Sequence, residues 1–351
     1  MSTQGKSNAY RDAGVDIDMA QNLLQRVKGK ISATRRPEVL APIGGFGGLF
    51  QLDLSKYRHP VMVASVDGVG TKLVVANMMD KHDTVGFDIV NHCINDIAVQ
   101  GAEPVYFLDY LGIGKLRSPL FEQVLDGLAE ACLAQNVTLL GGETAEMPGM
   151  YGDDYDLVGS ITGIVEKDRM ITGEKVAPGH VAIGLPSSGL HTNGYSLARN
   201  ALFEKAGLDV HDEPEGLGCS LGEALLKPHV CYWPAIKAAL DGGLSLDGMA
   251  HITGGGLYDN VPRVLPEGVA VSFDASTIPV PAIFRLIETC GDIDPYEMYR
   301  VFNMGVGMVW FVPETEADRA IALASESGFA AWRVGTVTSG ARKVTMENVE
   351  N

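Results

Sequence analysis

Apolar and polar positions follow two different periods along this chain. Four short apolar runs in the first half have the length of buried strands: residues 61–64, 106–108, 137–140 and 157–165. Residues 84–99 and 118–128 instead carry apolar side chains every three or four positions, which predicts amphipathic helices. The same spacing over residues 23–31 predicts a helix before the first strand. This alternation of strands and helices indicates an α/β fold.

The pattern continues in the second half, after a charged break at residues 166–169. Three apolar runs there predict strands, and a helix is expected from Tyr195 onward; the runs are 181–185, 269–273 and 308–312. A chain of 351 residues exceeds what one hydrophobic core usually fills. We therefore expect two domains, residues 1–168 and residues 169–351.

Composition and charge narrow the class of protein. The chain is 46% hydrophobic, and it holds no apolar stretch of about 20 residues that would predict a membrane span. Its net charge of −17 argues against a nucleic-acid partner, because phosphate backbones bind basic surfaces. The N-terminus lacks the apolar segment of a signal peptide, and the five cysteines form no Cys-x-x-Cys pair. We therefore expect a cytoplasmic protein without a disulfide scaffold or a zinc site.

The first candidate for chemistry is a strand that ends in Asp67-Gly68-Val69-Gly70-Thr71-Lys72. Glycine lets backbone N–H groups approach phosphate oxygens, a carboxylate can hold Mg²⁺, and a lysine can meet a further phosphate charge. The run therefore predicts phosphoryl chemistry, although it lacks the glycine spacing of a Walker loop. We also expect divalent cations, because one lysine cannot offset the charge of a nucleoside triphosphate in so acidic a protein.

The helix predicted at residues 84–99 has a polar side that contains no Lys, Glu or Arg. Asp88, His92 and Asp96 are four residues apart, so they lie along one face, with two asparagines beside them. Asp and Asn are poor helix formers, so a facing metal or ligand, or hydrogen bonds to neighbouring backbone, should offset the cost. We assign Asp96 to a metal site, because short carboxylates suit Mg²⁺, and we interpret His92 as a packed, hydrogen-bonded histidine.

Two further glycine turns are open to two interpretations each. Gly141-Gly142-Glu143-Thr144 follows a predicted strand, so Glu143 is a candidate third ligand for the metal or the substrate. An ordinary turn at the end of a strand is the alternative. The segment 43–50, with Gly45 and Gly47, could close over a ligand as a lid or form a tight turn that packs on a strand.

The second half carries two polar loops ahead of predicted helices. The first loop contains Ser187, Ser188, His191, Thr192 and Asn193. Free N–H groups and the helix dipole favour negative charge at such a position, so the loop predicts an anion pocket; a capped helix start without a ligand is the alternative. The second loop contains Thr253, Gly254 and Gly255, with His251 just upstream. The two loops together predict a site for a phosphorylated substrate.

These motifs together resemble a known family. The run from Asp67 to Lys72, followed by Asp96 and then by Gly101-Ala102-Glu103-Pro104, is similar to the ATP-binding half of the aminoimidazole ribonucleotide synthetase superfamily. The resemblance covers nearly the whole chain, through residues 10–17, 44–50, 141–151, 187–195 and 252–256. Sibling branches fit less well: selenophosphate synthetases carry a reactive Cys or Sec in the first glycine segment, and hydrogenase maturation relatives end in a cysteine.

The resemblance implies an ATP-dependent ring closure that converts formylglycinamidine ribonucleotide to 5-aminoimidazole ribonucleotide in purine biosynthesis. It implies that Asp67, Asp96 and Glu143 bind Mg²⁺, and that Asp67, Lys72, Asp96 and His191 are catalytic. Nucleotide contacts are implied for Lys28, Gly45, Gly47, Gly68, Val69, Gly70, Thr71, Lys72, Gly141 and Gly142. Substrate contacts are implied for Ser187, Ser188, His191, Thr192, Asn193, His251, Thr253, Gly254 and Gly255.

The resemblance also implies an architecture and partners. The first domain would be an ATP- and Mg²⁺-binding unit with a mixed sheet that pairs across a homodimer, and the second an α/β unit (overall α+β) that contributes substrate loops. ATP and Mg²⁺ are the implied cofactors, and a monovalent cation such as K⁺ is left open. Two alternatives remain: a sibling phosphoryl-transfer enzyme that acts on another small molecule, and a non-catalytic nucleotide-binding scaffold.

Overall fold

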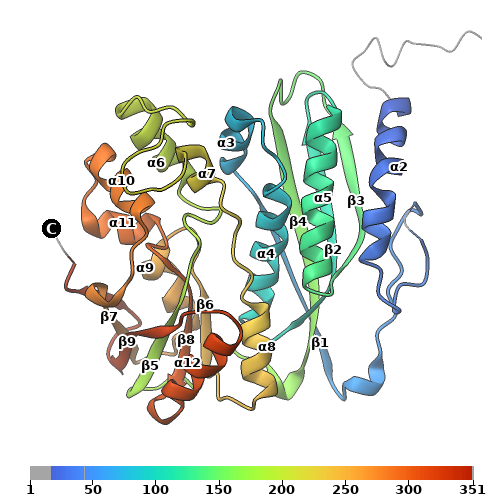
Figure 1. Cartoon of the computed structure of the whole chain (residues 1–351). Helices are drawn as coiled ribbons and strands as arrows, with labels where there is room; N and C mark the ends of the chain where they lie inside the picture. Colours follow the sequence, from blue (N-terminus) through green and yellow to red (C-terminus); the bar gives the residue numbers. More distant parts are fainter. Residues whose placement is uncertain (1–16, 43, 350–351) are drawn as a thin grey trace, which may run out of the picture.

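The computed structural model describes residues 17–42 and 44–349, and it divides them between two sheets (Figure 1). The strand order is β1-β4-β2-β3 in the first sheet and β10-β7-β9-β5-β8-β6 in the second. The α/β (α+β) class predicted from the pattern is confirmed. Residues 10–16, which carry part of the resemblance, lie outside the described residues.

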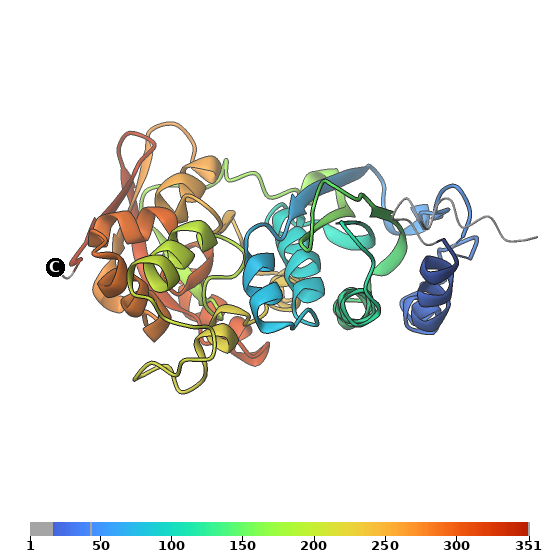
Figure 2. The same ribbon diagram turned by 90° about the horizontal axis from the view of Figure 1, so that it is seen from above.

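The first sheet is mixed, as the resemblance implied, because β4 is antiparallel to β1 and β2 while β3 is parallel to β2. Its strands are β1 (Pro60–Gly68), β2 (Glu103–Ile113), β3 (Thr138–Glu146) and β4 (Tyr155–Glu166). One face is covered by a row of helices (Figures 1 and 2), namely α2 (Ile17–Ala33), α4 (Val85–Ala98) and α5 (Ser118–Ala134), and α3 (Lys72–Met79) follows β1. The helices expected at 84–99 and 118–128 are confirmed.

The two faces of this sheet differ in how well they are covered. Side chains alternate along β1, so Val63 and Asp67 point to the face that α4 covers. Met62 and Val66 point to the other face, where they are 46% and 67% exposed. Leu108 of β2 is also exposed there, at 38%. The described residues therefore leave an apolar sheet face open.

The second sheet forms the core of the second half. Its strands are β5 (His180–Pro186), β6 (Gly248–His251), β7 (Val269–Asp274), β8 (Val306–Pro313), β9 (Trp332–Ser339) and β10 (Val344–Glu347). Trp310 and Phe311 of β8 are fully buried, which marks β8 as part of the centre of this core. The strands expected at 181–185, 269–273 and 308–312 are confirmed.

Several short helices pack around the second sheet. They are α6 (Tyr195–Arg199), α7 (Leu221–Leu225), α8 (Trp233–Asp241), α9 (Gly256–Asn260), α10 (Ala282–Gly291), α11 (Pro295–Val301) and α12 (Ala317–Glu326). A π-helical segment, Asn200–Lys205, continues α6. Helix α8 and the residues just before it reach across to α4 of the first half (Figure 1). None of the described helices combines the length and hydrophobicity that a membrane crossing needs.

Candidate active site

Helix α4 turns its polar side toward the second half of the chain. Asn95 Nδ2 donates to the carbonyl oxygen of Val230 over 2.8 Å, and Asn95 Oδ1 accepts from the N–H of Tyr232 over 2.9 Å. Asn91 Nδ2 donates to the carbonyl oxygen of His229 over 2.7 Å. An amide side chain offers both a donor and an acceptor, which suits it to bind backbone in this way. The two asparagines therefore join the halves, and these bonds offset their poor helix propensity.

The ammonium group of Lys72 lies in the interior, not in the phosphate-binding position expected from the sequence. Lys72 Nζ is fully buried and donates to Asp88 Oδ1 over 2.8 Å, with further bonds to the carbonyl oxygens of Lys227 at 2.8 Å and His191 at 3.2 Å. Burial lowers the pKa of Lys72 and raises the pKa of Asp88. Three acceptors use all three N–H groups of the ammonium, so in this arrangement Lys72 has none left for a phosphate.

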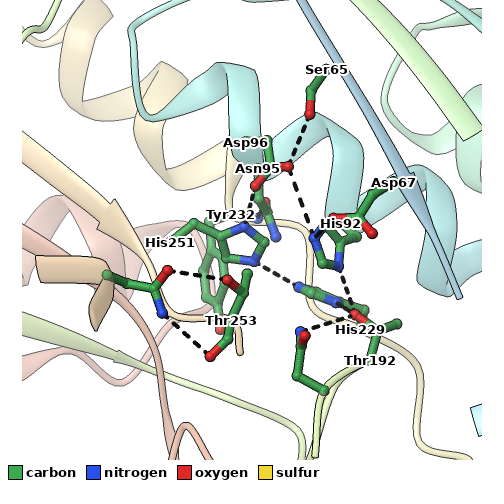
Figure 3. A network of polar contacts seen from close by, with 12 residues as sticks. Ser65, Asp67, His92, Asn95, Asp96, Thr192, His229, Tyr232, His251 and Thr253 are labelled. Carbon is green, nitrogen blue, oxygen red and sulfur yellow. Dashed lines mark hydrogen bonds and ion pairs between the residues drawn. The ribbon is translucent and has the colours of Figure 1, made fainter. Parts of the chain in front are cut away.

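Asp67 and Asp96 come together, as expected of two ligands of one metal ion. His92 Nε2 lies 2.9 Å from Asp67 Oδ2 and 3.8 Å from Asp96 Oδ2 (Figure 3). Ser65 Oγ donates to Asp96 Oδ2 over 3.0 Å. Because side chains alternate along a strand, Ser65 and Asp67 of β1 share the face that meets α4. The two carboxyl groups therefore belong to one site, and His92 is the packed histidine that the sequence indicated.

Further side chains close a ring of polar contacts around this carboxylate pair (Figure 3). His92 Nδ1 lies 2.6 Å from Thr192 Oγ1, which lies 3.3 Å from His229 Nδ1. His229 Nε2 lies 2.9 Å from His251 Nε2, and His251 Nδ1 lies 2.8 Å from Asp96 Oδ1. We call Asp67, His92, Thr192, His229, His251 and Asp96 the carboxylate–histidine ring. It draws its members from both halves of the chain.

The contacts of the ring favour negatively charged Asp67 and Asp96 and a positively charged His92. Burial opposes ionisation of Asp67, but the hydrogen bond and charge of His92 outweigh it and lower the pKa of Asp67. Burial likewise opposes ionisation of Asp96, where His251 has the larger effect and lowers the pKa. Burial disfavours the charged form of His92, yet Asp67 and Asp96 raise its pKa. Burial lowers the pKa of His251 and takes the pKa of His229 well below its ordinary value.

The donor atoms of the ring fit a divalent cation. His92, Asp96 and His251 each offer an atom within 4.8 Å of the others, and this is the one such group among the residues that the structure describes. Asp67 adds a carboxyl group whose oxygens accept from Gly68 N–H and face His92. A carboxylate oxygen has two lone pairs, so these contacts leave capacity for a metal. Mg²⁺ prefers oxygen ligands and would therefore use Asp67 and Asp96.

The backbone of the motif after Asp67 is only partly available for a phosphate. The N–H of Gly68 donates to Asp67 Oδ1 over 2.7 Å, and the N–H of Val69, which is buried, donates to the carbonyl oxygen of Leu157 over 3.0 Å. Gly70 and Thr71 are exposed, and Gly70 has a φ of +68°, a conformation that favours glycine. The N–H groups of Gly68 and Val69, which the sequence analysis expects to bind phosphate, therefore already donate hydrogen bonds within the chain.

Glu143 lies at the opposite edge of the first sheet from Asp67. Strands β4 and β2 separate β1 from β3, and Asp67, Gly159, Asp109 and Gly142 form one row across them. At about 4.8 Å per strand, this row spans about 14 Å. Within one chain, this arrangement does not support Glu143 as a third ligand beside Asp67 and Asp96, because the strand order places β3 too far away.

Glu143 and the glycine turns instead line a separate cavity of about 630 Å³, which we call the β3 cavity. Among its lining residues are Gly45, Gly47, Gly141 and Gly142, all expected to contact a nucleotide. Helices α2 and α5 supply its other walls. Lys28 is exposed on α2 but does not line the cavity. The nucleotide contacts expected from the sequence thus fall into two groups, one beside Asp67 and one at β3.

Hydrogen bonds within the protein hold the first polar loop of the second half in place. Ser187 Oγ donates to Asn303 Oδ1 over 2.8 Å, and the N–H of Ser188 donates to His191 Nε2 over 3.2 Å. His191 is 1% exposed, and its ring stacks on that of His229 with centroids 4.0 Å apart. Burial takes the pKa of His191 well below its ordinary value, so the imidazole is neutral. The catalytic role that the resemblance implies for His191 stays a prediction.

The second polar loop borders a larger cavity of about 1000 Å³, which we call the α9 cavity. Gly254 and Gly255 line it together with Gly194, whereas the Thr253 hydroxyl donates to Asn260 Oδ1 over 3.1 Å. Three cationic residues also line it, Arg300, Arg342 and Lys343, together with three acidic ones, Asp259, Asp294 and Glu297. The guanidinium group of Arg342 donates to the carbonyl oxygens of Pro262 and Arg263, so Arg300 and Lys343 are the candidates for a phosphate. None of these cationic residues, nor His229, belongs to a sequence motif, so the sequence alone does not point to them.

The chain is similar to curated enzymes over nearly its full length. It is 50% identical over 344 residues to phosphoribosylformylglycinamidine cyclo-ligase from Syntrophotalea carbinolica, which covers 98% of each chain. It is 48% identical over 331 residues to the enzyme of the same name from Bifidobacterium animalis subsp. lactis, with 94% of this chain and 96% of that one covered. It is 46% identical over 345 residues to the enzyme of that name from Brevibacillus brevis, and the match covers 98% of this chain and 99% of that one.

Solved structures with the same fold include hydrogenase maturation protein HypE in complex with ATP, with a TM-score of 0.66, 18% identity, and 96% and 93% of the two chains covered. Thiamine-monophosphate kinase from Stenotrophomonas maltophilia gives a TM-score of 0.64 at 17% identity, covering 93% and 96%. The sequence matches the AIR synthase related protein, N-terminal domain, over residues 55–165, and the C-terminal domain of the same description over residues 177–347. The chain therefore belongs to the AIR synthase related protein family.

Proposed function

We propose that this chain catalyses the ATP-dependent cyclisation of formylglycinamidine ribonucleotide to 5-aminoimidazole ribonucleotide, with release of ADP and phosphate. The observation that carries the proposal is the identity of 46% to 50%, over nearly the full length, with enzymes named phosphoribosylformylglycinamidine cyclo-ligase. The carboxylate–histidine ring supports it, because it brings Asp67 and Asp96 into one site that suits Mg²⁺.

The reaction needs an activated amide oxygen, because an amide oxygen is a poor leaving group. Transfer of the γ-phosphoryl group of ATP to the formyl amide oxygen releases ADP and gives an O-phosphorylated intermediate. The amidine nitrogen then attacks the formyl carbon, forms the new C–N bond and loses a proton. The C–O bond breaks, and the former amide oxygen leaves with the phosphate. The protein contributes mainly position and charge stabilisation to such a phosphoryl transfer.

Each group of side chains takes a distinct part in this proposal. Asp67 and Asp96 hold Mg²⁺, which when bound neutralises charge on the phosphates, and His92 positions both carboxyl groups. Lys72 acts through structure, since its bond to Asp88 fixes the start of α3 and with it the exposed backbone of Gly70. The glycine turns of the β3 cavity contact the nucleotide.

The substrate occupies the α9 cavity and the neighbouring loops in this proposal. Arg300 and Lys343 meet its phosphate, and Gly194, Gly254 and Gly255 let it approach the backbone. This cavity adjoins the ring through Asn193, whose Nδ2 lies 3.5 Å from Thr192 Oγ1 and whose Oδ1 would lie 3.2 Å from a Cβ on Gly254. The reacting end of the substrate can therefore approach the carboxylates while its phosphate stays in the α9 cavity.

We further propose a cytoplasmic homodimer that docks through the open face of the first sheet. Met62, Val66 and Leu108 support this, because exposed apolar side chains gathered on one sheet face favour burial against a partner. The cysteines support a reducing compartment, since all five are free. A monovalent cation such as K⁺ remains an open addition to ATP and Mg²⁺.

The direct test is to incubate the protein with ATP, Mg²⁺ and formylglycinamidine ribonucleotide and to measure ADP and the aminoimidazole product. The proposal expects the two products in equal amounts. ADP without the imidazole would favour a sibling enzyme that phosphorylates another molecule, and neither product would favour a nucleotide-binding scaffold. Omitting Mg²⁺ serves as the control, and it should suppress both products.

A further inference from the structure

The carboxylate–histidine ring holds more imidazole than a magnesium site needs. Mg²⁺ prefers oxygen ligands, which Asp67 and Asp96 supply. Three buried histidines, His92, His229 and His251, lie at the same site and come from both halves of the chain (Figure 3). Imidazole nitrogen is a preferred ligand of Zn²⁺ and similar metals, not of Mg²⁺. The ring therefore offers ligands to a second class of cation.

Four donor atoms of the ring have the spacing of a tetrahedral metal site. His92 Nε2 lies 2.9 Å from Asp67 Oδ2 and 3.8 Å from Asp96 Oδ2, and His251 Nδ1 lies 2.8 Å from Asp96 Oδ1. Zn²⁺ takes four such ligands at about 2.0–2.2 Å, which places neighbouring donor atoms about 3.3–3.5 Å apart. The observed distances lie on both sides of this range, so small side-chain movements would bring the four donors around one ion.

The second ring nitrogen of each candidate histidine ligand already has a partner. His92 Nδ1 lies 2.6 Å from Thr192 Oγ1, and His251 Nε2 lies 2.9 Å from His229 Nε2. Histidines that bind a metal almost always use their other nitrogen in this way, because the contact fixes the orientation of the ring. Thr192 and His229 thus act as positioning residues that turn His92 Nε2 and His251 Nδ1 toward the carboxyl groups.

Solvent reaches this site from its acidic side. The side chains of Asp67 and Asp96 are 42% and 27% exposed, whereas those of His92 and His251 are 4% and 3% exposed. An ion can therefore contact the carboxylates first and the buried nitrogens behind them. The ion would replace the Nε2 proton of His92, which leaves to water, while His251 and His229 would each move their single proton to the other ring nitrogen.

We propose that the carboxylate–histidine ring binds Zn²⁺ or a chemically similar divalent metal ion in competition with Mg²⁺, through four ligands: His92, His251, Asp67 and Asp96. The competition rests on the proposed function, because that function places Mg²⁺ on the same two carboxylates. The lack of Cys-x-x-Cys pairs argues only against a cysteine-ligated zinc site, since histidine and carboxylate ligands form a separate class.

Titration of the full-length protein with Co²⁺, in the absence of nucleotide, tests this inference. Co²⁺ replaces Zn²⁺ in tetrahedral sites, where it absorbs visible light far more strongly than in octahedral ones. The wild type should develop intense visible bands that saturate at one Co²⁺ per chain, and Zn²⁺ should remove them by displacement. A large excess of Mg²⁺ should raise the apparent Kd for Co²⁺. Weak octahedral bands, or a Co²⁺ affinity that Mg²⁺ leaves unchanged, would overturn the inference.

Histidine variants show which side chains hold the ion. His92→Gln and His251→Gln each remove a nitrogen ligand and keep both carboxylates, and each should weaken Co²⁺ binding about 10²-fold or more. Thr192→Val removes the partner of His92 and should weaken binding about 10–100-fold. His211→Gln changes an exposed histidine elsewhere and should bind as the wild type does.

Unchanged Co²⁺ binding in a folded His92→Gln or His251→Gln variant would contradict the histidine ligands. Circular dichroism identifies a variant that fails to fold, and the wild-type spectrum then still decides between a tetrahedral and an octahedral site. Failure of the proposed function would look different, because the wild type would form no aminoimidazole while its Co²⁺ bands persisted. A protein that forms aminoimidazole but lacks these bands would keep the proposed function and lose this inference.

Discussion

The carboxylate–histidine ring and the β3 cavity are built in opposite ways, although both use residues of the same four-stranded sheet. In the ring, each acid already contacts a histidine and each histidine contacts another polar group. The β3 cavity is instead lined mainly by apolar side chains and glycines, with Gln21, Asp109, Glu143 and Thr144 as its polar lining residues. The polar groups of the ring are thus preorganised by contacts with one another, whereas the β3 cavity offers mostly apolar surface.

The two regions also differ in which parts of the chain they join. The ring connects β1 and α4 to the loop after β5, to His229 and to β6, so it exists only when both halves are folded together. The β3 cavity is lined by residues of the first half alone. Disruption of the contacts between the halves should therefore damage the ring first and leave the cavity largely intact.

The sharpest way to break the ring is Asp96→Asn. The amide removes one charge from the proposed metal site, so ADP and aminoimidazole formation should fall by about 10²–10³-fold or more. Circular dichroism and the melting temperature should stay close to those of the wild type, because Asn keeps the shape of the side chain. A folded variant that retains full activity would contradict the metal role of Asp96; Asp168→Asn is the matched control.

Lys72→Met tests whether Lys72 belongs to the interior or to the phosphate site. Removal of the ammonium leaves Asp88 buried without its partner, which should lower the free energy of unfolding by about 3–5 kcal/mol. Replacing both members of the pair, as Lys72→Met with Asp88→Leu, should recover much of that loss. If the single variant keeps the wild-type unfolding free energy and instead loses affinity for ATP, Lys72 is a phosphate ligand after all.

Asn95→Ala probes the junction on which the ring depends. The change leaves the carbonyl of Val230 and the N–H of Tyr232 without their partner, so the free energy of unfolding should fall by about 1–3 kcal/mol. Urea unfolding measures the loss, and Asn22→Ala on the exposed face of α2 is the control. An unfolding free energy equal to that of the wild type would show that these two hydrogen bonds do not hold the halves together.

The smallest effect concerns the segment that leads into the β3 cavity. A hydrogen bond from Arg36 is the largest influence on Glu38 and lowers its pKa. A lowered pKa in the folded state adds stability above the unfolded pKa of about 4.5, and this stability is lost as pH falls through the folded value. Glu38→Gln should therefore flatten the pH dependence of unfolding below about pH 4.5. Identical pH profiles for the variant and the wild type would refute this contribution.

Local patterns in the sequence predicted much of the fold. The helix expected at residues 84–99 is α4, because its apolar spacing fits one buried face and Asp96 and His92 fall on the other side. Six of the expected strands fall within β1, β2, β4, β5, β7 and β8, because each contains a short apolar run, whereas no expectation covers β6, β9 and β10. The strand expected at 137–140 is longer in the structure, since β3 continues to Glu146 through Gly141 and Gly142, which carry no apolar side chains that would indicate a strand.

The candidate site was predicted only in part. Asp67 and Asp96 both lie near His92, because strand β1 and helix α4 pack together; their role as metal ligands stays a prediction. The sequence does not predict His229 as a site residue, because a single histidine outside a motif has no signature in one sequence. The sequence analysis expects Glu143 at the same metal ion as Asp67, because each carboxylate stands next to glycine at the end of an apolar run, but such a pattern does not reveal how many strands lie between them.

The sequence by itself determined the periodic elements, the acidic and glycine-rich turns and the family, because these depend on residues close together in the chain. Only the tertiary structure decided which charged side chains lie next to one another. It paired Lys72 with Asp88, because an ammonium that leaves water needs a buried counter-charge, and it separated Glu143 from Asp67 by the strand order. Burial and long-range pairing set the protonation and partners of each side chain, and neither can be read from neighbours along the chain.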